Sequence, residues 1–173
     1  MAEVEVVRNA HGGRAKVRLR VAMDEAASAA TILALPTTPL SWTGEDPSML
    51  WLGPDQWLVL SDTQTAEAII SEYTARLQGL LHSATDASAA LVCFAVDGPS
   101  ARLLLSMGSG VDFDARSFGT GRCVSTRFAR IPALIRAVAA DSFELYVDRS
   151  LGDYLPSWFE HASRDPFFTT RKK

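Results

Sequence analysis

Apolar and basic side chains alternate along residues 14–21, RAKVRLRV. A period of two predicts a strand with one buried face. The other face carries Arg14, Lys16, Arg18 and Arg20, which could dock an acidic partner or a ligand with carboxylates. We interpret it instead as a solvated strand face, or as an edge strand whose charges resist aggregation.

A hairpin is predicted at residues 49–61, MLWLGPDQWLVLS. Two apolar runs flank Gly53-Pro54-Asp55-Gln56, which reads as a tight turn because Gly and Pro interrupt regular structure and Asp can bond its own backbone. The flanking runs are rich in Trp, Leu and Val, as half-buried strands are. We therefore expect Trp57 to be a core aromatic side chain.

Helical periodicity is found on both sides of this hairpin. Asp24 can cap a helix that continues to Leu35. After the hairpin, residues 65–81 carry an apolar stripe at helical spacing, with Asp62 or Thr63 as the expected cap. The stripe consists of Ala66, Ile69, Ile70, Tyr73, Leu77 and Leu80.

The same order of elements recurs in the second half of the chain. Residues 88–96 form a nearly continuous apolar run, typical of a central strand. Residues 99–107 predict a short helix that Pro99 can begin. One or two extended segments are expected around Pro132, and they lead into a hairpin at about residues 134–147.

A last helix is predicted at residues 151–162. Ser150-x-x-Asp153 resembles a capping box, so Ser150 is expected to cap it. Because Pro156 lies inside the helix, we expect a late start or a kink. The helix has an apolar stripe of Leu151, Tyr154, Leu155, Trp158, Phe159 and Ala162.

A βαββα pattern given twice predicts an α+β fold of two ferredoxin-like modules, each built on split βαβ units. The two hairpin turns align, with Asp55 opposite Asp141. The predicted organisation is a flexible N-terminus at 1–13, a single compact domain at 14–163 with pseudo-repeats 14–83 and 84–163, and a C-terminal tail at 164–173.

Composition and charge disfavour several classes of protein. The 173 residues carry a net charge of −3 and a pI near 5.6, which disfavours a dedicated nucleic-acid binder. No apolar run approaches the roughly 18 residues that a membrane span needs, and the first residues lack a signal-peptide pattern. Cys93 and Cys123 are isolated, so we expect reduced thiols in a cytoplasmic protein.

Residues with catalytic potential are few and scattered. His11, His82 and His161 are far apart, and none has a His or Cys partner at metal-site spacing. Gly119-x-Gly121 lacks the third glycine and the helix of a phosphate-binding loop. The sequence therefore predicts no catalytic, cofactor-binding or metal-binding residue on this chain.

A partner interface is the remaining candidate site. The start of the second half of the chain is basic, with Arg116, Arg122, Arg127, Arg130 and Arg136. The candidate interface residues are Arg122, Arg127 and Arg130, together with Phe167 and Phe168 in the tail. Arginine and aromatic side chains are enriched at protein interfaces. An ordinary exposed ribbon would look similar, and both interpretations stay open.

Several motifs together resemble one family. Residues 50–58, LWLGPDQWL, resemble the LWLGPDEWL signature of the γ subunit of heterotetrameric sarcosine oxidase. Residues 97–105 (DGPSARLLL), 121–126 (GRCVST) and 143–150 (FELYVDRS) follow in the same order as in that family. Departures are Gln56 in place of Glu, Pro156, and a short N-terminus. The motif residues expected to be structural are Gly53, Pro54, Asp55, Trp57, Gly98, Pro99, Arg149 and Ser150.

The resemblance implies a non-catalytic scaffold subunit of an αβγδ complex that demethylates sarcosine oxidatively to glycine and hydrogen peroxide. The one-carbon unit passes to tetrahydrofolate. FAD, FMN, NAD and the folate are expected on the α and β subunits and zinc on δ, with no cofactor on this chain. The fold would resemble the folate-binding part of glycine-cleavage aminomethyltransferase.

That likeness leaves an alternative function open, a folate-binding protein of one-carbon transfer. Such a protein needs an acidic residue aimed at the folate ring. Asp86, Asp97 and Asp112 are the candidates, and each is also a plausible turn residue.

Overall fold

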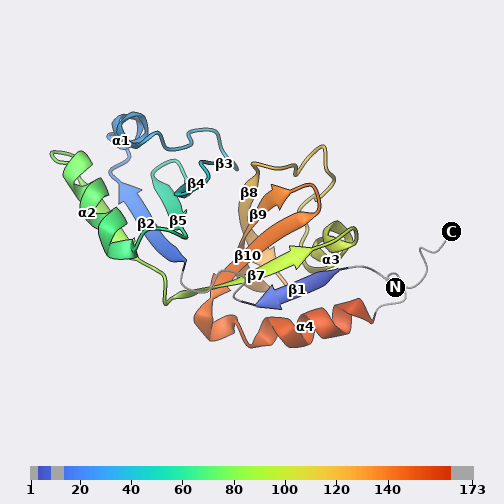
Figure 1. The fold of residues 1–173 in the computed structure, drawn as a ribbon. Helices are drawn as coiled ribbons and strands as arrows, with labels where there is room; N and C mark the ends of the chain where they lie inside the picture. Colours follow the sequence, from blue (N-terminus) through green and yellow to red (C-terminus); the bar gives the residue numbers. More distant parts are fainter. Residues whose placement is uncertain (1–3, 9–13, 165–173) are drawn as a thin grey trace. The chain divides into compact units, whose positions relative to one another are not determined.

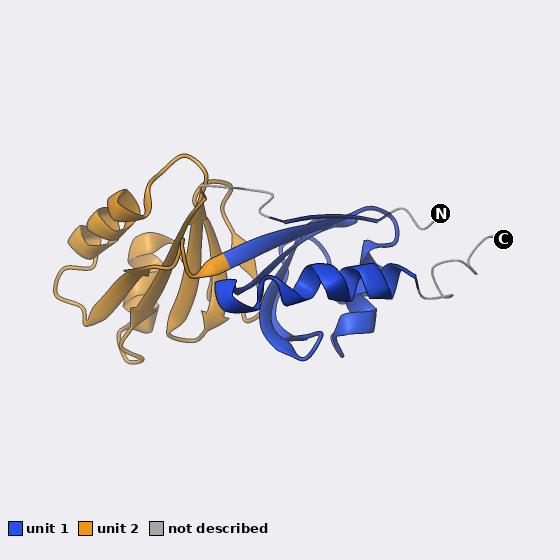
Figure 2. Ribbon diagram, turned by 90° about the horizontal axis from the view of Figure 1, so that it is seen from below, with its two compact units in different colours: residues 1–10, 92–173 blue, residues 11–91 orange. Residues whose placement is uncertain are grey.

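The computed structural model describes residues 4–8 and 14–164. The chain divides into two compact units, shown in Figure 2. Unit 1 comprises residues 1–10 and 92–173, and unit 2 comprises residues 11–91. Among the described residues, no helix is long and apolar enough to span a membrane.

Unit 2 is a five-stranded sheet with two helices (Figure 1). The strand order is β3-β4-β5-β2-β6, and β2 pairs antiparallel with both β5 and β6. Since β5 separates β2 from β4, and β2 separates β5 from β6, the unit contains two split βαβ motifs. Its elements are β2 (Ala15–Val21), α1 (Ala26–Leu33), β3 (Trp42–Thr43), β4 (Ser48–Gly53), β5 (Gln56–Ser61), α2 (Ala66–Arg76) and β6 (His82–Asp86).

One hydrophobic core joins the sheet and the helices of unit 2. Alternate residues of β2, from Ala15 to Val21, contribute to it, as the period-two pattern predicts. The apolar stripe of α2 packs there through Ile69, Tyr73 and Leu77. Helix α2 begins at Ala66 because the Thr65 side chain accepts a hydrogen bond from the Ala68 N–H at 3.2 Å.

Unit 1 has an equivalent sheet, with strand order β1-β7-β10-β9-β8. Strands β10 and β8 both pair antiparallel with β9, and β1 pairs antiparallel with β7. The elements are β1 (Glu5–Arg8), β7 (Leu91–Asp97), α3 (Ala101–Gly108), β8 (Cys123–Phe128), β9 (Ile131–Ala139), β10 (Ser142–Asp148), a 3-10 turn (Arg149–Leu151) and α4 (Tyr154–Ser163).

The two sheets match position by position. Strand β7 corresponds to β2, β9 and β10 to the β4–β5 hairpin, and β8 to the edge strand β3. In unit 2 the remaining edge is formed by β6, which follows α2 in the chain. In unit 1 that place is taken by β1, from the N-terminus. Residues 5–8 therefore form a strand within the segment predicted to be flexible.

Aromatic side chains dominate the core of unit 1. Phe113 and Phe118 come from the loop after α3 and contact Phe143 of β10 at centroid separations of 6.4 Å. Phe128 of β8 packs on Trp158 of α4 at 4.8 Å. These contacts tie the long loop and α4 to the same face of the sheet.

The predicted elements occur in the predicted order, but several ends differ and strands β1, β3 and β6 were not predicted. The strand at residues 15–21 is confirmed. The helix predicted at 65–81 ends at Arg76, and β6 follows at 82–86, so the predicted boundary between residues 83 and 84 falls inside a strand. Strand β9 begins at Ile131 rather than near 134.

The cap predicted for the last helix was wrong. Asp148, not Ser150, is the capping acceptor, and it caps a 3-10 turn by accepting from the Ser150 N–H at 2.8 Å and the Ser150 hydroxyl at 2.6 Å. Helix α4 begins only at Tyr154. Pro156 thus lies in its first turn, where no intrahelical N–H is needed, and the predicted late start is confirmed.

The basic face of β2 is only partly solvated, contrary to expectation. Arg14 and Lys16 are buried, whereas Arg18 and Arg20 are exposed. Arg14 forms a two-pronged ion pair with Asp62, with Nε–Oδ1 at 2.8 Å and Nη2–Oδ2 at 2.7 Å. A charge paired in this way can be buried.

Candidate functional site

The signature turn at residues 53–56 is held to the end of β2. The Val21 N–H donates to the Asp55 carbonyl at 3.0 Å. The buried Asp55 carboxylate accepts from Arg20 Nε at 3.2 Å and from Gln56 Nε2 at 3.2 Å. Asp55 therefore fixes the register between the hairpin and the first strand of unit 2.

Trp57 extends the same structural role into the core. Its side chain is 1% exposed, and its indole N–H donates to the Pro36 carbonyl at 2.9 Å. The bond satisfies the one polar group of a buried indole and anchors the segment that follows α1. The signature tryptophan therefore stabilises unit 2 from within.

Unit 1 repeats this arrangement with other residues. Gly98 follows β7 with φ +114°, a conformation that suits glycine, and its N–H donates to the Asp141 carbonyl at 2.9 Å. Asp141 is the residue that the sequence aligns with Asp55. The strand-end-to-turn hydrogen bond is thus common to the two units, and Pro99 follows it on the way into α3.

Arg102 of α3 completes the tie in unit 1. Its guanidinium donates to the carbonyls of Phe113 and Phe118, at 2.6 and 2.9 Å, and to that of Ala140 through Nε at 3.0 Å. It also lies over the ring of Phe143, 4.9 Å from the centroid. One side chain thus holds the loop after α3 to the β9–β10 turn.

The acidic residues considered for folate serve turns. Asp86 accepts from the Ser88 N–H at 2.8 Å, and Asp112 from the Asp114 N–H at 3.0 Å and the Ser117 hydroxyl at 2.6 Å. Hydrogen bonds from Ser88 and Ser117 lower the pKa of Asp86 and of Asp112, respectively. Asp97 ends β7 and is half-buried.

Histidines and metal ligands do not cluster. The Nδ1 atoms of His82 and His161 lie 2.8 Å from the Leu80 carbonyl and 2.7 Å from the Ser157 carbonyl, respectively. His11 lies outside the described residues. Within residues 4–8 and 14–164, no group of three His, Cys, Asp or Glu side chains could hold a metal ion.

One polar cluster is deeply buried. Arg136 and Glu144 face each other across β9 and β10, with Nε–Oε2 at 2.7 Å, and the Tyr146 hydroxyl donates to the same carboxylate oxygen. All three side chains are buried. The cluster is a satisfied structural network, because each charge has a partner and solvent hardly reaches it.

The predicted interface arginines lie along one edge of unit 1. We call Arg122, Arg127 and Arg130 the arginine edge: they precede β8, lie on it and follow it, at the last strand of the sheet. Arg127 and Arg130 are exposed. None of the three forms an ion pair with another described residue. Phe167 and Phe168, the other predicted interface residues, lie outside the described part.

The turn after β8 has a constrained backbone. Ala129 and Arg130 have φ values of +48° and +72°, as in the two-residue turns that suit hairpin twist. Neither residue is glycine, so the conformation is costly and needs support. The Ala129 N–H donates to the Gly108 carbonyl at 2.7 Å, and Arg127 Nη1 to the Arg130 carbonyl at 3.1 Å.

Sequence reasoning missed a surface depression of about 470 Å³ in unit 2. Met23 and Leu81 are prominently exposed beside it, and Arg20, Asp55 and His82 contribute polar groups. The predicted helix over 65–81 would have placed Leu81 at a helix end. In the structure α2 ends at Arg76, and Leu81 is exposed just before β6.

Comparison with known proteins gives one consistent family. Residues 16–165 match the model of the sarcosine oxidase, gamma subunit family. Two curated relatives are named sarcosine oxidase subunit gamma: one from an Arthrobacter species is 31% identical over 64% of this chain, and one from Corynebacterium strain U-96 is 29% identical over 77%. The alignments cover 53% and 65% of those proteins, so this chain spans between half and two thirds of their length.

Solved structures share the fold. A chain of the heterotetrameric sarcosine oxidase from Corynebacterium strain U-96 superposes with a TM-score of 0.83 at 23% identity, covering 98% of this chain and 87% of that one. Glycine cleavage system aminomethyltransferase T from Bartonella henselae gives 0.64 at 12% identity, covering 95% and 46%. The predicted α+β fold and its likeness to aminomethyltransferase are thereby confirmed.

Proposed function

The chain belongs to the sarcosine oxidase gamma subunit family, and we propose that it is the gamma subunit of a heterotetrameric oxidase complex. The proposed complex demethylates sarcosine to glycine with formation of hydrogen peroxide and passes the one-carbon unit to tetrahydrofolate. The observation that carries the proposal is the family match along residues 16–165.

The chain's proposed role is that of a scaffold for the flavin-bearing subunits. Support comes from the signature residues, which hold the fold: Asp55 and Trp57 bond within unit 2, and Gly98 within unit 1. The proposal assigns FAD, FMN, NAD and tetrahydrofolate to the α and β subunits and zinc to δ. It includes a cytoplasmic location, consistent with Cys93 and Cys123 not being in a disulfide.

Omitting this chain tests the scaffold role. The α, β and δ subunits are coexpressed with and without it, and assembly is followed by size-exclusion chromatography together with sarcosine oxidation per bound flavin. We expect the flavin subunits to separate or aggregate without the chain. If they assemble and oxidise sarcosine equally well without it, the scaffold role is wrong.

Folate binding by this chain is the second candidate. The fold shared with aminomethyltransferase T favours it, although a fold alone does not specify a ligand. Asp86 and Asp112 would have to give up turn hydrogen bonds to meet a folate ring. Calorimetric titration of the isolated chain with tetrahydrofolate at high micromolar concentration tests this candidate. A measurable heat of binding supports folate binding, and the absence of any heat rejects it.

A further inference from the structure

We propose that the outer edge of β8 binds an extended, acidic segment of a partner subunit as an additional strand of the unit 1 sheet. The inference rests on the proposed function, since it names the contact through which the scaffold would hold a partner. Recognition would combine main-chain hydrogen bonds with carboxylates on the arginine edge.

Strand β8 is an edge strand of the described sheet. It ends the order β1-β7-β10-β9-β8 and, among the described strands, pairs only with β9, from Cys123↔Arg136 to Phe128↔Ile131. The Ala137 N–H donates to the Arg122 carbonyl at 2.9 Å, so Arg122 points its carbonyl toward β9. By alternation, Ser125 and Arg127 turn their N–H and C=O groups outward. Both residues are exposed.

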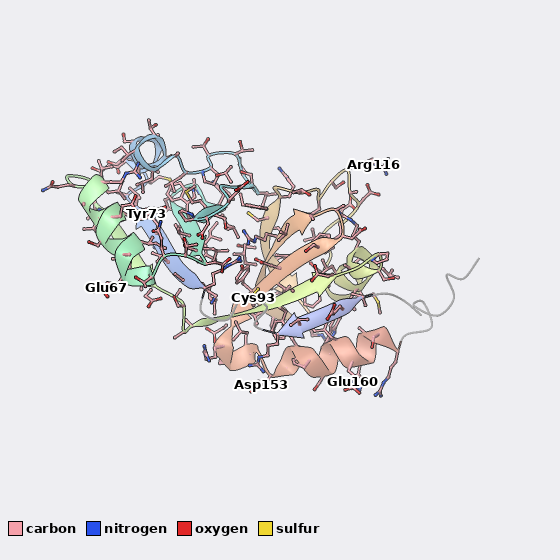
Figure 3. All side chains as sticks on the ribbon, viewed as in Figure 1. Glu67, Tyr73, Cys93, Arg116, Asp153 and Glu160 are labelled. Atoms are coloured by element: carbon pink, nitrogen blue, oxygen red, sulfur yellow. The ribbon has the colours of Figure 1, made fainter. Side chains whose placement is uncertain are left out.

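The charge around this edge is one-sided. From residue 115 to residue 140 the sequence has five arginines and no acidic residue, although the whole chain is acidic at −3. Arg136 is paired with Glu144, and Arg116, labelled in Figure 3, is paired with Asp114 at 2.9 Å. The arginine edge keeps the remaining three charges.

Acidic residues near the edge are already engaged. Asp112 and Asp114, in the loop before β8, accept hydrogen bonds from within that loop. Arg122, Arg127 and Arg130 thus keep guanidinium groups that the carboxylates of a partner can bind.

Arg122 also has an unsatisfied side-chain donor. Its Nε is buried and is the one buried side-chain nitrogen or oxygen among the described residues without a hydrogen-bond acceptor. Leaving a buried donor unsatisfied costs about 1–3 kcal/mol. Because the chain's own atoms cover this nitrogen, an acceptor from an added strand reaches it only if the Arg122 side chain shifts.

A protein strand fits this edge better than a nucleic acid. Binding of single-stranded nucleic acid uses aromatic side chains on which bases stack. The exposed residues of β8 are Ser125 and Arg127, and the aromatic Phe128 is fully buried. The arginine edge thus offers charge and main-chain groups without a stacking surface.

A peptide tests the edge directly on the full chain. The probe alternates glutamate and valine over about ten residues, the length of a long strand. We expect it to slow hydrogen exchange at the amides of Ser125 and Arg127, with an affinity that falls as salt rises. The controls are the same peptide with lysine for glutamate and one with a central proline, and both should leave these amides unprotected.

Variants separate charge from backbone pairing. Arg127→Glu with Arg130→Glu reverses the charge, and Ser125→Pro removes an outward N–H that a strand partner needs. Each variant should lower the affinity for the acidic peptide by at least about tenfold. Arg18→Glu, on β2 of unit 2, changes an exposed arginine elsewhere and should have no effect. Arg127→Gln with Arg130→Gln replaces the reversal if that variant fails to fold.

Either of two peptide results overturns the proposal. One is an acidic peptide that gives no protection of Ser125 and Arg127. The other is a single-stranded oligonucleotide that protects them where the peptide does not. Association with the α and β subunits is measured for the wild-type chain and for both edge variants. If the variants associate as well as the wild type does, the edge is not the contact, and the scaffold role stands. Peptide binding without any association with α and β rejects the scaffold role instead.

Discussion

In both units a main-chain hydrogen bond joins the end of a strand to the hairpin turn, and an arginine–aspartate ion pair lies beside it. The aspartate is the more buried member of the pair in unit 2, and the arginine is the more buried member in unit 1. In unit 2 the carboxylate of Asp55 is 11% exposed and its partner Arg20 is 67% exposed. In unit 1 Asp141 is 53% exposed and Arg102 is 18% exposed. The repeat conserves the hydrogen bond from strand end to turn, and each unit completes it with a different residue.

The difference follows from what each arginine must reach. Arg20 lies on the strand and bonds only its neighbouring turn. Arg102 lies on α3 and bridges the turn to the loop that contains Phe113 and Phe118. In unit 2 the segment between α1 and β3 is shorter, and the hydrogen bond from the Trp57 indole N–H to the Pro36 carbonyl anchors it. Equivalent topology therefore tolerates different anchors.

The largest expected effects come from the matched core aromatics, Trp57 in unit 2 and Phe143 in unit 1, which are 1% and 0% exposed. Truncating either to alanine should lower the free energy of unfolding by about 3–5 kcal/mol, because each leaves a large cavity. Urea unfolding measures it, with Trp57→Phe as the milder control. An unchanged stability for Trp57→Ala would show that Trp57 faces a partner and that the two positions are not equivalent.

The arginine ties should differ in strength. Arg102→Gln leaves buried carbonyls without a donor, so we expect a loss of about 1.5–3 kcal/mol. Arg20→Gln removes a largely exposed ion pair and should cost less than about 1 kcal/mol. Urea unfolding of both variants checks this ratio. Equal losses would contradict the inverted burial of the two ties.

Gly108 tests how closely α3 approaches β8. A Cβ placed there would lie 2.4 Å from Phe128 Cε2, whereas one at Gly110 would have no atom within 4 Å. Gly108→Ala should therefore destabilise by about 1–3 kcal/mol through overpacking. Gly110→Ala should stay within about 0.5 kcal/mol, as surface changes do. Thermal unfolding distinguishes the pair, and a neutral Gly108→Ala would mean that Phe128 can move aside.

The smallest expected effect is a loss of folding stability at low pH. The Ser61 hydroxyl, together with the Thr63 N–H, lowers the pKa of Asp46 below 3.8 in unit 2. In unit 1 Ser117 does the same for Asp112. A lowered folded pKa gives stability that is present above pH 3.8 and lost as pH falls through the folded value.

Asparagine variants measure this acid effect. Asp46→Asn and Asp112→Asn should each be slightly less stable than wild type at pH 7, with the gap closing below pH 3.8. Unfolding by urea across this pH range measures the gap. A gap independent of pH would show that the carboxylates do not contribute through their charge.

Sequence patterns predicted the repeated elements because apolar alternation marks β2 and the apolar stripe marks α2. They missed β1 and β6, whose residues are mostly exposed and polar, so their pairing depends on a neighbouring strand and not on their own pattern. The burial of Arg14 was also missed, since its partner Asp62 lies far along the chain.

The arginines of the arginine edge stand out in the composition, whereas their position at an edge strand does not follow from it. Five arginines and no acidic residue lie between residues 115 and 140 of the sequence. That Arg136 is paired and buried while Arg127 is exposed depends on strand register, which residue types alone do not fix.

Purification of the tagged chain from its native cell tests the central claim most directly. The chains that come with it are identified by mass spectrometry, and the absorbance spectrum of the eluate is recorded. Membership in an oxidase complex predicts larger co-purifying subunits and visible flavin bands. A single colourless chain under the same conditions would contradict it.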